Sequence, residues 1–262
     1  MYKSKSRFSS KYDAKMALKT LLNYSPNFNP KKRTSKQIKF IIFHYTGMKS
    51  ESNAMKRLTD IQSEVSCHYL IKNNGGIVKM VPDLYIAWHA GRSSWQNYKS
   101  LNLNSIGIEI TNPGHEYGYK KFTKKQITSL IKLSRFLIKK YKISSKNILG
   151  HSDIAALRKK DPGEKFPWEY LSKNKIGVWH TLNKQDLMKD RKLKISKIEE
   201  NYFFNNLFKI GYSKKYPKDN SKNKHLMELV KTFQRRFRQE LVDGKIDQEC
   251  LLISKSLSKT YN

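Results

Sequence analysis

The sequence predicts an α/β fold, with a mixed central sheet flanked by helices, followed by a small three-helix domain. Three observations predict this organisation. Short apolar runs alternate with helical patterns across residues 31–180, which is typical of a sheet covered by helices. Residues 181–197 are charged and poor in large apolar groups, which indicates a linker. Residues 198–262 then show only amphipathic helical spacing.

The first 30 residues form a basic, polar lead-in to the predicted α/β domain. They end in the sequence SPNFNP, whose prolines are expected to prevent regular structure. The apolar run IKFIIFHY, residues 38–45, then predicts a central buried strand. Residues 67–81, CHYLIKNNGGIVKMV, predict two strands around an Asn-Asn-Gly-Gly turn, and residues 105–111, SIGIEIT, predict another strand.

The helical patterns lie in the second half of the chain. Apolar residues recur at helical spacing across residues 123–141, and Thr123 is well placed to cap the start of that helix. Three shorter helices are predicted within residues 198–212, 225–237 and 242–257. Leu226, Leu229, Val230, Phe233 and Phe237 would share one face of the second of these helices.

Composition limits the possible partners and locations. No apolar run of the 262 residues approaches the roughly 20 needed to cross a bilayer as a helix. The net charge of +32 comes from lysines spread through every segment, so we expect solvated surface charge and no nucleic-acid partner. Residues 1–22 contain no secretory signal pattern, which favours the cytoplasm by default, with the periplasm or cell envelope as the alternative. We expect a monomer, with Cys67 and Cys250 as buried small apolar side chains.

Three residues at predicted strand ends and turns form a candidate metal centre. His44 lies near the end of one strand, His151 follows the apolar run NILG, and Asp161 begins the turn DPG. Open α/β sheets place their sites at such strand ends. Two imidazoles and one carboxylate suit a catalytic zinc ion that keeps its fourth position open for water. Spacing alone leaves a structural role open for each histidine.

Five segments together resemble a known family. They are IIFHYTG, SCHYLIKNNGGIVKMV, AWHAGRSSW, NLNSIGIEITN and ILGHSDIAALRKKDPGEKFPW, in this order. In order and spacing they resemble the type 2 N-acetylmuramoyl-L-alanine amidases, which include the peptidoglycan recognition proteins, and they are most similar to the AmiD/AmpD branch. The resemblance covers roughly residues 25–180. The segment FQRRFRQELVDGKIDQE looks like the peptidoglycan-binding module that follows the catalytic domain in AmiD-like enzymes.

The resemblance implies a zinc amidase of peptidoglycan turnover or recycling. It implies one Zn²⁺ per chain on His44, His151 and Asp161, with Glu109 as general base and acid and Lys159 as the group that stabilises the oxyanion. The substrate would be peptidoglycan or a muropeptide, cut between N-acetylmuramic or 1,6-anhydro-muramic acid and L-alanine. The alternative is a recognition protein that binds peptidoglycan without cleaving it.

Further residues of the matched segments are candidates for the substrate cleft. His68 and His89 would either line the cleft or support and pack against the centre, and the resemblance does not decide between these roles. Trp88, Trp95 and Asn104 are candidate walls for the glycan or peptide, whereas Trp168 is expected in the core. The remaining histidines, 115, 180 and 225, match no motif and are expected at the surface.

Overall fold

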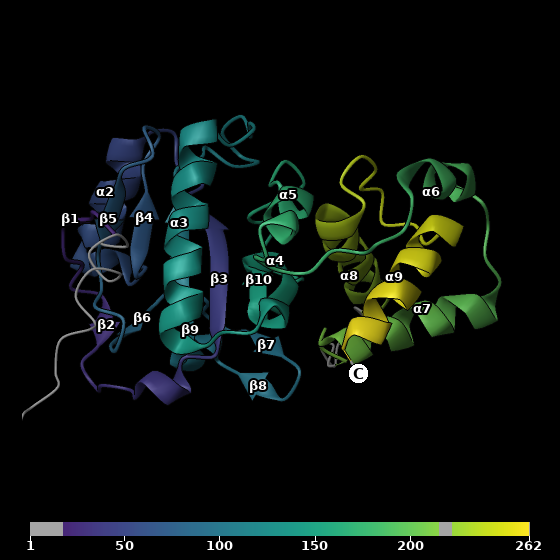
Figure 1. The fold of residues 1–262 in the computed structure, drawn as a ribbon, viewed down its shortest axis with the longest axis horizontal. Helices are drawn as coiled ribbons and strands as arrows, with labels where there is room; N and C mark the ends of the chain where they lie inside the picture. Colours follow the sequence, from purple (N-terminus) through teal and green to yellow (C-terminus); the bar gives the residue numbers. More distant parts are fainter. Residues whose placement is uncertain (1–17, 215–221, 262) are drawn as a thin grey trace, which may run out of the picture.

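The computed structural model describes residues 18–214 and 222–261, and it contains the predicted α/β fold followed by helices (Figure 1). In these residues six strands form one sheet in the order β1-β5-β4-β9-β3-β10. The pairs between β4, β9, β3 and β10 are parallel, while β4 and β5 are antiparallel. The strands of this sheet are β1 (Leu21–Leu22), β3 (Phe40–Tyr45), β4 (Tyr69–Ile71), β5 (Ile77–Lys79), β9 (Ser105–Ile110) and β10 (Ile148–Gly150).

Shorter strands and several helices complete the chain. Two small antiparallel pairs, β2 with β6 and β7 with β8, lie outside the main sheet. Their bounds are β2 (Phe28–Asn29), β6 (Ile86–Ala87), β7 (Ser94–Trp95) and β8 (Tyr98–Lys99). The α-helices are α2 (Glu51–Thr59), α3 (Lys124–Tyr141), α4 (His151–Ile154), α5 (Trp168–Lys173), α6 (Lys184–Asp190), α7 (Lys197–Ile210), α8 (Lys222–Phe237) and α9 (Gln248–Thr260).

The α3 helix covers one face of the sheet (Figure 1). It begins as predicted, because the Thr123 hydroxyl accepts a hydrogen bond from Gln126 N–H and the Gln126 side chain accepts one from Thr123 N–H. Its apolar stripe packs against alternate residues of β3, among them Ile41 and Phe43. Since β3 is paired on both sides and buried on both faces, the prediction of a central buried strand is confirmed.

Helices α7, α8 and α9 form a bundle beyond the edge strand β10 (Figure 1). The bundle is not separated from the sheet by solvent. Phe40, Ile42 and Leu149 of the sheet belong to the same buried apolar cluster as Phe203 and Leu207 of α7. The two parts of the chain therefore share a continuous core.

Two expectations about the connecting segments were wrong. The lead-in contains the short strands β1 and β2 within its described part, because strand pairing with β5 and β6 satisfies its backbone despite the nearby prolines. The rest of the lead-in, residues 1–17, lies outside the described residues. The expected linker contains the helix α6. Asn183 caps the start of this helix, and its residue Leu187 is buried in the shared core. Both cysteines are free and buried, as expected. In the described part of the chain no helix is both long and apolar enough to span a bilayer.

Candidate metal centre

The parallel strands bring the candidate residues to one edge of the sheet. The backbones of His44 in β3 and Glu109 in β9 are direct partners in the ladder, so their side chains project to the same face. The adjacent strand β10 ends at Gly150, and His151 is the first residue of α4. Asp161 joins them because Ser152 N–H donates to the Asp161 carbonyl oxygen at 2.9 Å.

The donor atoms of the three proposed ligands converge on one point. The distance from His44 Nδ1 to His151 Nδ1 is 3.0 Å, and each of these nitrogens lies 3.0–3.1 Å from Asp161 Oδ2. All three side chains are buried. Two nitrogens and one carboxylate oxygen are ligands that zinc accepts in catalytic sites, so the residues present fit this metal.

A chain of hydrogen bonds fixes the tautomer of His44. The Ser105 hydroxyl donates to the Leu101 carbonyl oxygen at 2.6 Å, so its oxygen is free to accept from His89 Nε2–H, 3.1 Å away. His89 Nδ1 then accepts from His44 Nε2–H at 3.0 Å. As a result, the lone pair of His44 lies on Nδ1, the atom that faces the other two ligands.

The second histidine is oriented in the same way. His151 Nε2–H donates to the Ala90 carbonyl oxygen at 3.2 Å, which leaves its lone pair on Nδ1. Two nitrogen lone pairs and a carboxylate oxygen thus meet within hydrogen-bonding distance. These three electron-rich atoms repel one another unless a cation binds between them. This convergence is what a cation-binding centre requires.

Burial and charge set the ionisation of the ligands. Burial, followed by the neighbouring His151, lowers the pKa of His44 to about 4, so its ring is neutral near pH 7. The centre therefore presents a neutral His44 imidazole, the protonation state in which a histidine binds a metal ion.

Glu109 and Lys159 lie in the same pocket, which has a volume of about 490 Å³. Oε2 of Glu109 is buried and has no hydrogen-bond partner in the described residues. Burial, then the charge of Asp161, raises the pKa of Glu109 to about 8, while Lys159 acts in the opposite direction. A carboxyl that titrates near neutrality beside a ligand cluster is suited to accept and return protons.

Of the cleft candidates, Trp88 and His89 line this pocket and the other three do not. His68 is buried beside His89, with its Nδ1 accepting from Gly107 N–H and its Nε2 near the Tyr85 carbonyl and the Arg33 guanidinium. Trp95 is fully buried in the shared core against Tyr212. Asn104 precedes the first residue of β9, at the strand end away from Glu109. Trp168 is buried in the core, as expected.

His89 has a supporting role in the geometry, which sequence reasoning left open. Its ring lies directly over Gly107 of β9, where an added Cβ would come within 2.3 Å of His89 Cγ. Backbone N–H groups of His89 and Ala90 both donate to the Asn102 side-chain oxygen, which fixes the segment that carries the ring. The glycine thus makes room for the imidazole that orients His44.

The expectation that the remaining histidines lie at the surface was wrong. His115 lines the pocket, with its Nδ1 2.9 Å from the Tyr45 hydroxyl and its Nε2 3.0 Å from Glu164 Oε2. His225 is buried, and His180 is half-buried. Sequence reasoning missed His115 and Tyr45 as pocket residues, although Tyr45 adjoins a proposed ligand and His115 follows the end of β9, both at the functional edge of the sheet.

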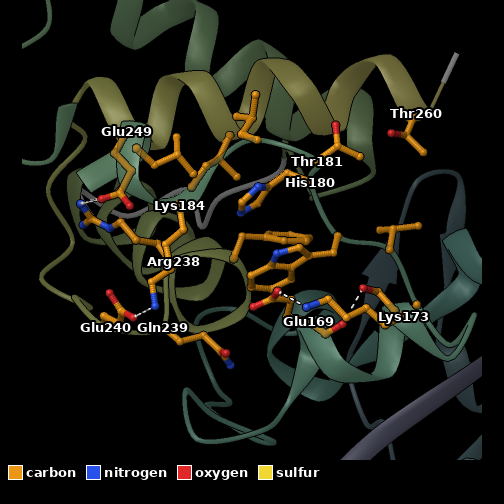
Figure 2. A pocket seen from close by; sticks show the side chains of 18 of the residues that line it. Glu169, Lys173, His180, Thr181, Lys184, Arg238, Gln239, Glu240, Glu249 and Thr260 are labelled. Carbon is orange, nitrogen blue, oxygen red and sulfur yellow. Dashed lines mark hydrogen bonds and ion pairs between the residues drawn. The ribbon is translucent and has the colours of Figure 1, made fainter. Parts of the chain in front are cut away.

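A second and larger pocket, of about 710 Å³, lies between α5, the segment after it and the bundle (Figure 2). His180 projects into it, and its Nδ1 has no partner in the described part of the chain. The acidic residues of this pocket pair with cations, in the ion pairs Glu169–Lys173, Glu240–Lys184 and Glu249–Arg191. None of the proposed ligands lines this pocket.

Comparisons with known proteins give a consistent result. Residues 34–164, half of the chain, match the family described as N-acetylmuramoyl-L-alanine amidase. The chain is 32% identical over 237 residues to N-acetylmuramoyl-L-alanine amidase AmiD of Escherichia coli K12, covering 86% of this chain and 84% of that protein. It is 34% identical over 167 residues to 1,6-anhydro-N-acetylmuramyl-L-alanine amidase AmpD of Haemophilus influenzae, covering 56% of this chain and 88% of that protein.

Solved structures resemble the whole described chain. The complex of AmiD from E. coli with the substrate anhydro-N-acetylmuramic acid-L-Ala-D-gamma-Glu-L-Lys matches with a TM-score of 0.75 and 30% identity, over 89% of this chain and 93% of that chain. AmpDh3 from Pseudomonas aeruginosa matches with a TM-score of 0.73 and 29% identity, over 89% of this chain and 94% of that chain. In both cases the similarity extends through the C-terminal helices, because it covers far more than residues 34–164.

Proposed function

This chain belongs to the N-acetylmuramoyl-L-alanine amidase family, and from that premise we propose that it is a zinc-dependent hydrolase of muropeptides. It cuts the amide bond between the lactyl group of N-acetylmuramic or 1,6-anhydro-muramic acid and L-alanine of the stem peptide. The observation that carries the proposal is the convergence of the His44 and His151 lone pairs on Asp161 Oδ2, next to the half-buried Glu109, whose Oε2 is buried.

His44, His151 and Asp161 would hold the zinc ion. When bound there, zinc supplies a Lewis acid that lowers the pKa of a water molecule to about 7 and polarises the scissile carbonyl. The protein contributes the orientation of its ligands, since each imidazole donates its outer N–H to a fixed acceptor, namely His89 Nδ1 or the Ala90 carbonyl. The ligands therefore need little rearrangement to bind.

Glu109 takes the proton of the attacking water and delivers it to the departing amine. The second transfer is needed because an amide nitrogen leaves poorly without a proton. Burial has placed the pKa of Glu109 at about 8, and a group near this value accepts and returns protons with little cost at neutral pH. Glu109 is paired with His44 in the β3–β9 ladder, so this strand pairing fixes the distance between the base and the ligand cluster.

Lys159 stabilises the negative charge that develops on the carbonyl oxygen. It lies half-buried in the wall of the pocket, two residues before Asp161, and the next residue, Lys160, lines the same pocket but is exposed. Arg57 and Arg158 also line this pocket and would attract the carboxylates of a stem peptide. A relative has been solved with such a ligand, anhydro-N-acetylmuramic acid carrying a tripeptide, which supports this class of substrate.

The test is metal-dependent turnover of a defined muropeptide. Purified protein is stripped with a chelator, reconstituted with one equivalent of zinc, and compared with Glu109→Gln and His151→Ala. Activity should disappear with the chelator, return with zinc, and be lost in both variants, while His180→Ala, a change at a half-buried histidine of the second pocket, should keep activity. Zinc-loaded protein that binds peptidoglycan but releases no product would instead identify a recognition protein.

A further inference from the structure

The short helix α4 organises two of the three proposed ligands. It begins at His151, and Ser152 N–H holds the Asp161 carbonyl oxygen at 2.9 Å. Asp153, also in its first turn, accepts a hydrogen bond from Gly150 N–H at 2.7 Å. Any shift of this turn relative to β3 would therefore separate His151 and Asp161 from His44.

The carboxylate of Asp153 is held from the opposite side by the C-terminal bundle. The hydroxyl of Tyr212, which lies two residues after α7, donates to Asp153 Oδ1 at 2.8 Å. The Arg236 guanidinium of α8 forms an ion pair with Asp153 Oδ2 and donates to the Ile148 carbonyl oxygen of β10 at 3.1 Å. The side chains of Asp153, Tyr212 and Arg236 are all buried. An unpaired charge at this depth would cost considerable free energy.

The guanidinium is itself fixed by aromatic rings. Its central carbon lies 4.3 Å from the centroid of the Trp168 ring and 4.9 Å from that of Phe237. Trp168 belongs to the catalytic part of the chain and Phe237 to α8, so Arg236 is sandwiched between the two parts. Tyr212 packs in a similar way, edge-on against Trp95 with ring centroids 4.9 Å apart.

We infer that the bundle is a structural part of the metal centre, and that Arg236 and Tyr212 are positioning residues that hold α4 so that His151 and Asp161 converge on His44. A bundle tethered only by a flexible linker would leave Asp153 buried without its cation. The inference rests on the proposed function for the identity of the metal, but the positioning of α4 can be measured in the metal-free protein.

The bundle offers a matched control for this contact. Arg238, two residues after Arg236, is also buried and forms ion pairs with Asp243 and Asp247, which both belong to the C-terminal part. Arg236→Met and Arg238→Met each remove a buried cation from a buried ion pair, but only Arg236 reaches α4. Tyr212→Phe is a milder change, which removes one hydroxyl and keeps the ring against Trp95.

The experiment measures zinc affinity and local opening in the full-length variants. Zinc affinity is obtained by competition with a chromophoric chelator, and amide hydrogen exchange of residues 148–154 is followed by mass spectrometry without metal. We expect Arg236→Met to weaken zinc binding about tenfold or more, as loss of outer partners of metal ligands commonly does, and Tyr212→Phe about threefold. Exchange of residues 148–154 should accelerate in both, and Arg238→Met should change the affinity by less than about twofold.

Two outcomes would overturn the inference. One is equal zinc affinity and equal exchange in the wild type, Arg236→Met and Tyr212→Phe. The other is an equal loss of affinity in Arg236→Met and Arg238→Met, because that would reflect general destabilisation. If the wild type itself fails to retain zinc, the metal assignment of the proposed function fails, while the exchange rates still decide whether the bundle positions α4.

Discussion

Replacing the proposed base by its neutral isostere, Glu109→Gln, should stabilise the metal-free protein at alkaline pH. The pKa of Glu109 is raised from an ordinary 4.5 to about 8 in the folded protein. A carboxyl with a raised pKa contributes its full stability below the unfolded value of 4.5, and that contribution is lost as the pH rises towards 8. The wild type should therefore lose stability over this range, and the variant should not.

The magnitude follows from the size of the shift. One pKa unit corresponds to about 1.4 kcal/mol, so the difference between 4.5 and 8 sets an upper limit of about 5 kcal/mol. Because Glu109 lines an open pocket and is only half-buried, screening by water reduces this value, and we expect the variant to gain about 1–2 kcal/mol at pH 8. For a chain of this size that gain corresponds to a rise in Tm of about 3–6 °C.

The assay is urea unfolding of chelator-treated wild type and Glu109→Gln at pH 5 and pH 8. Only the difference between the two proteins is interpreted, since the buried histidines contribute equally to both. Glu116→Gln serves as the control, because Glu116 is an exposed glutamate of the same pocket. Parallel pH profiles for the wild type and Glu109→Gln would refute the claim that burial holds this carboxyl protonated near neutrality.

Three other predictions concern catalysis, ligand orientation and the shared core. Lys159→Met should lower kcat about 100-fold or more with little change in KM. Lys160→Met, at the exposed neighbouring residue, should leave kcat within about twofold. Equal effects of the two variants in steady-state kinetics would contradict the role of Lys159. Ser105→Ala removes the acceptor of His89 Nε2–H and should weaken zinc binding about tenfold in a chelator competition, and unchanged affinity would exclude the proposed orientation of His44. Leu207→Ala should lower the free energy of unfolding by about 2–5 kcal/mol, because it removes a buried side chain from the shared core. Circular dichroism and tryptophan fluorescence should still show one cooperative unfolding transition, whereas separate transitions would show that the bundle and the sheet unfold independently.

The strand pattern could predict much of the fold and the position of the centre. Apolar runs of strand length mark β3 and β9, and residues at the ends of parallel strands meet at one edge of a sheet, which brings His44 and Glu109 together. The helical period and the Thr123 cap likewise define α3. These features are local, so a single sequence contains them.

The partners of the ligands could not be predicted because they come from distant segments without a local signal. The Ala90 carbonyl and the Ser105 hydroxyl orient the imidazoles, but the sequence around them shows only a loop and a strand start. Trp95 was assigned to the cleft because an aromatic residue in a matched segment suits a wall and a core equally well. Asn104, also a candidate wall of the cleft, immediately precedes β9 and lies five residues from Glu109, or about 16 Å along a strand.

The contacts of the bundle with the sheet could not be predicted from the sequence either. Its helices were predicted from their apolar spacing, but Arg236 appears in the sequence as one of several cations on a charged helix face. Only the packing of α8 against β10 and α4 reveals that this guanidinium is buried and paired with Asp153. A charged residue of this kind is indistinguishable from a solvated one until the tertiary structure places it.

The masses of the reaction products test the proposed chemistry at Glu109 and the three ligands. A muropeptide is incubated with zinc-loaded protein, and the products are identified by mass spectrometry, with reduced and 1,6-anhydro glycan ends compared. We expect free stem peptide, with L-alanine at its amino end, together with the muramyl sugar that retains its lactyl group, and no products in the presence of a chelator. Intact substrate, or cleavage within the peptide or the glycan, would contradict it.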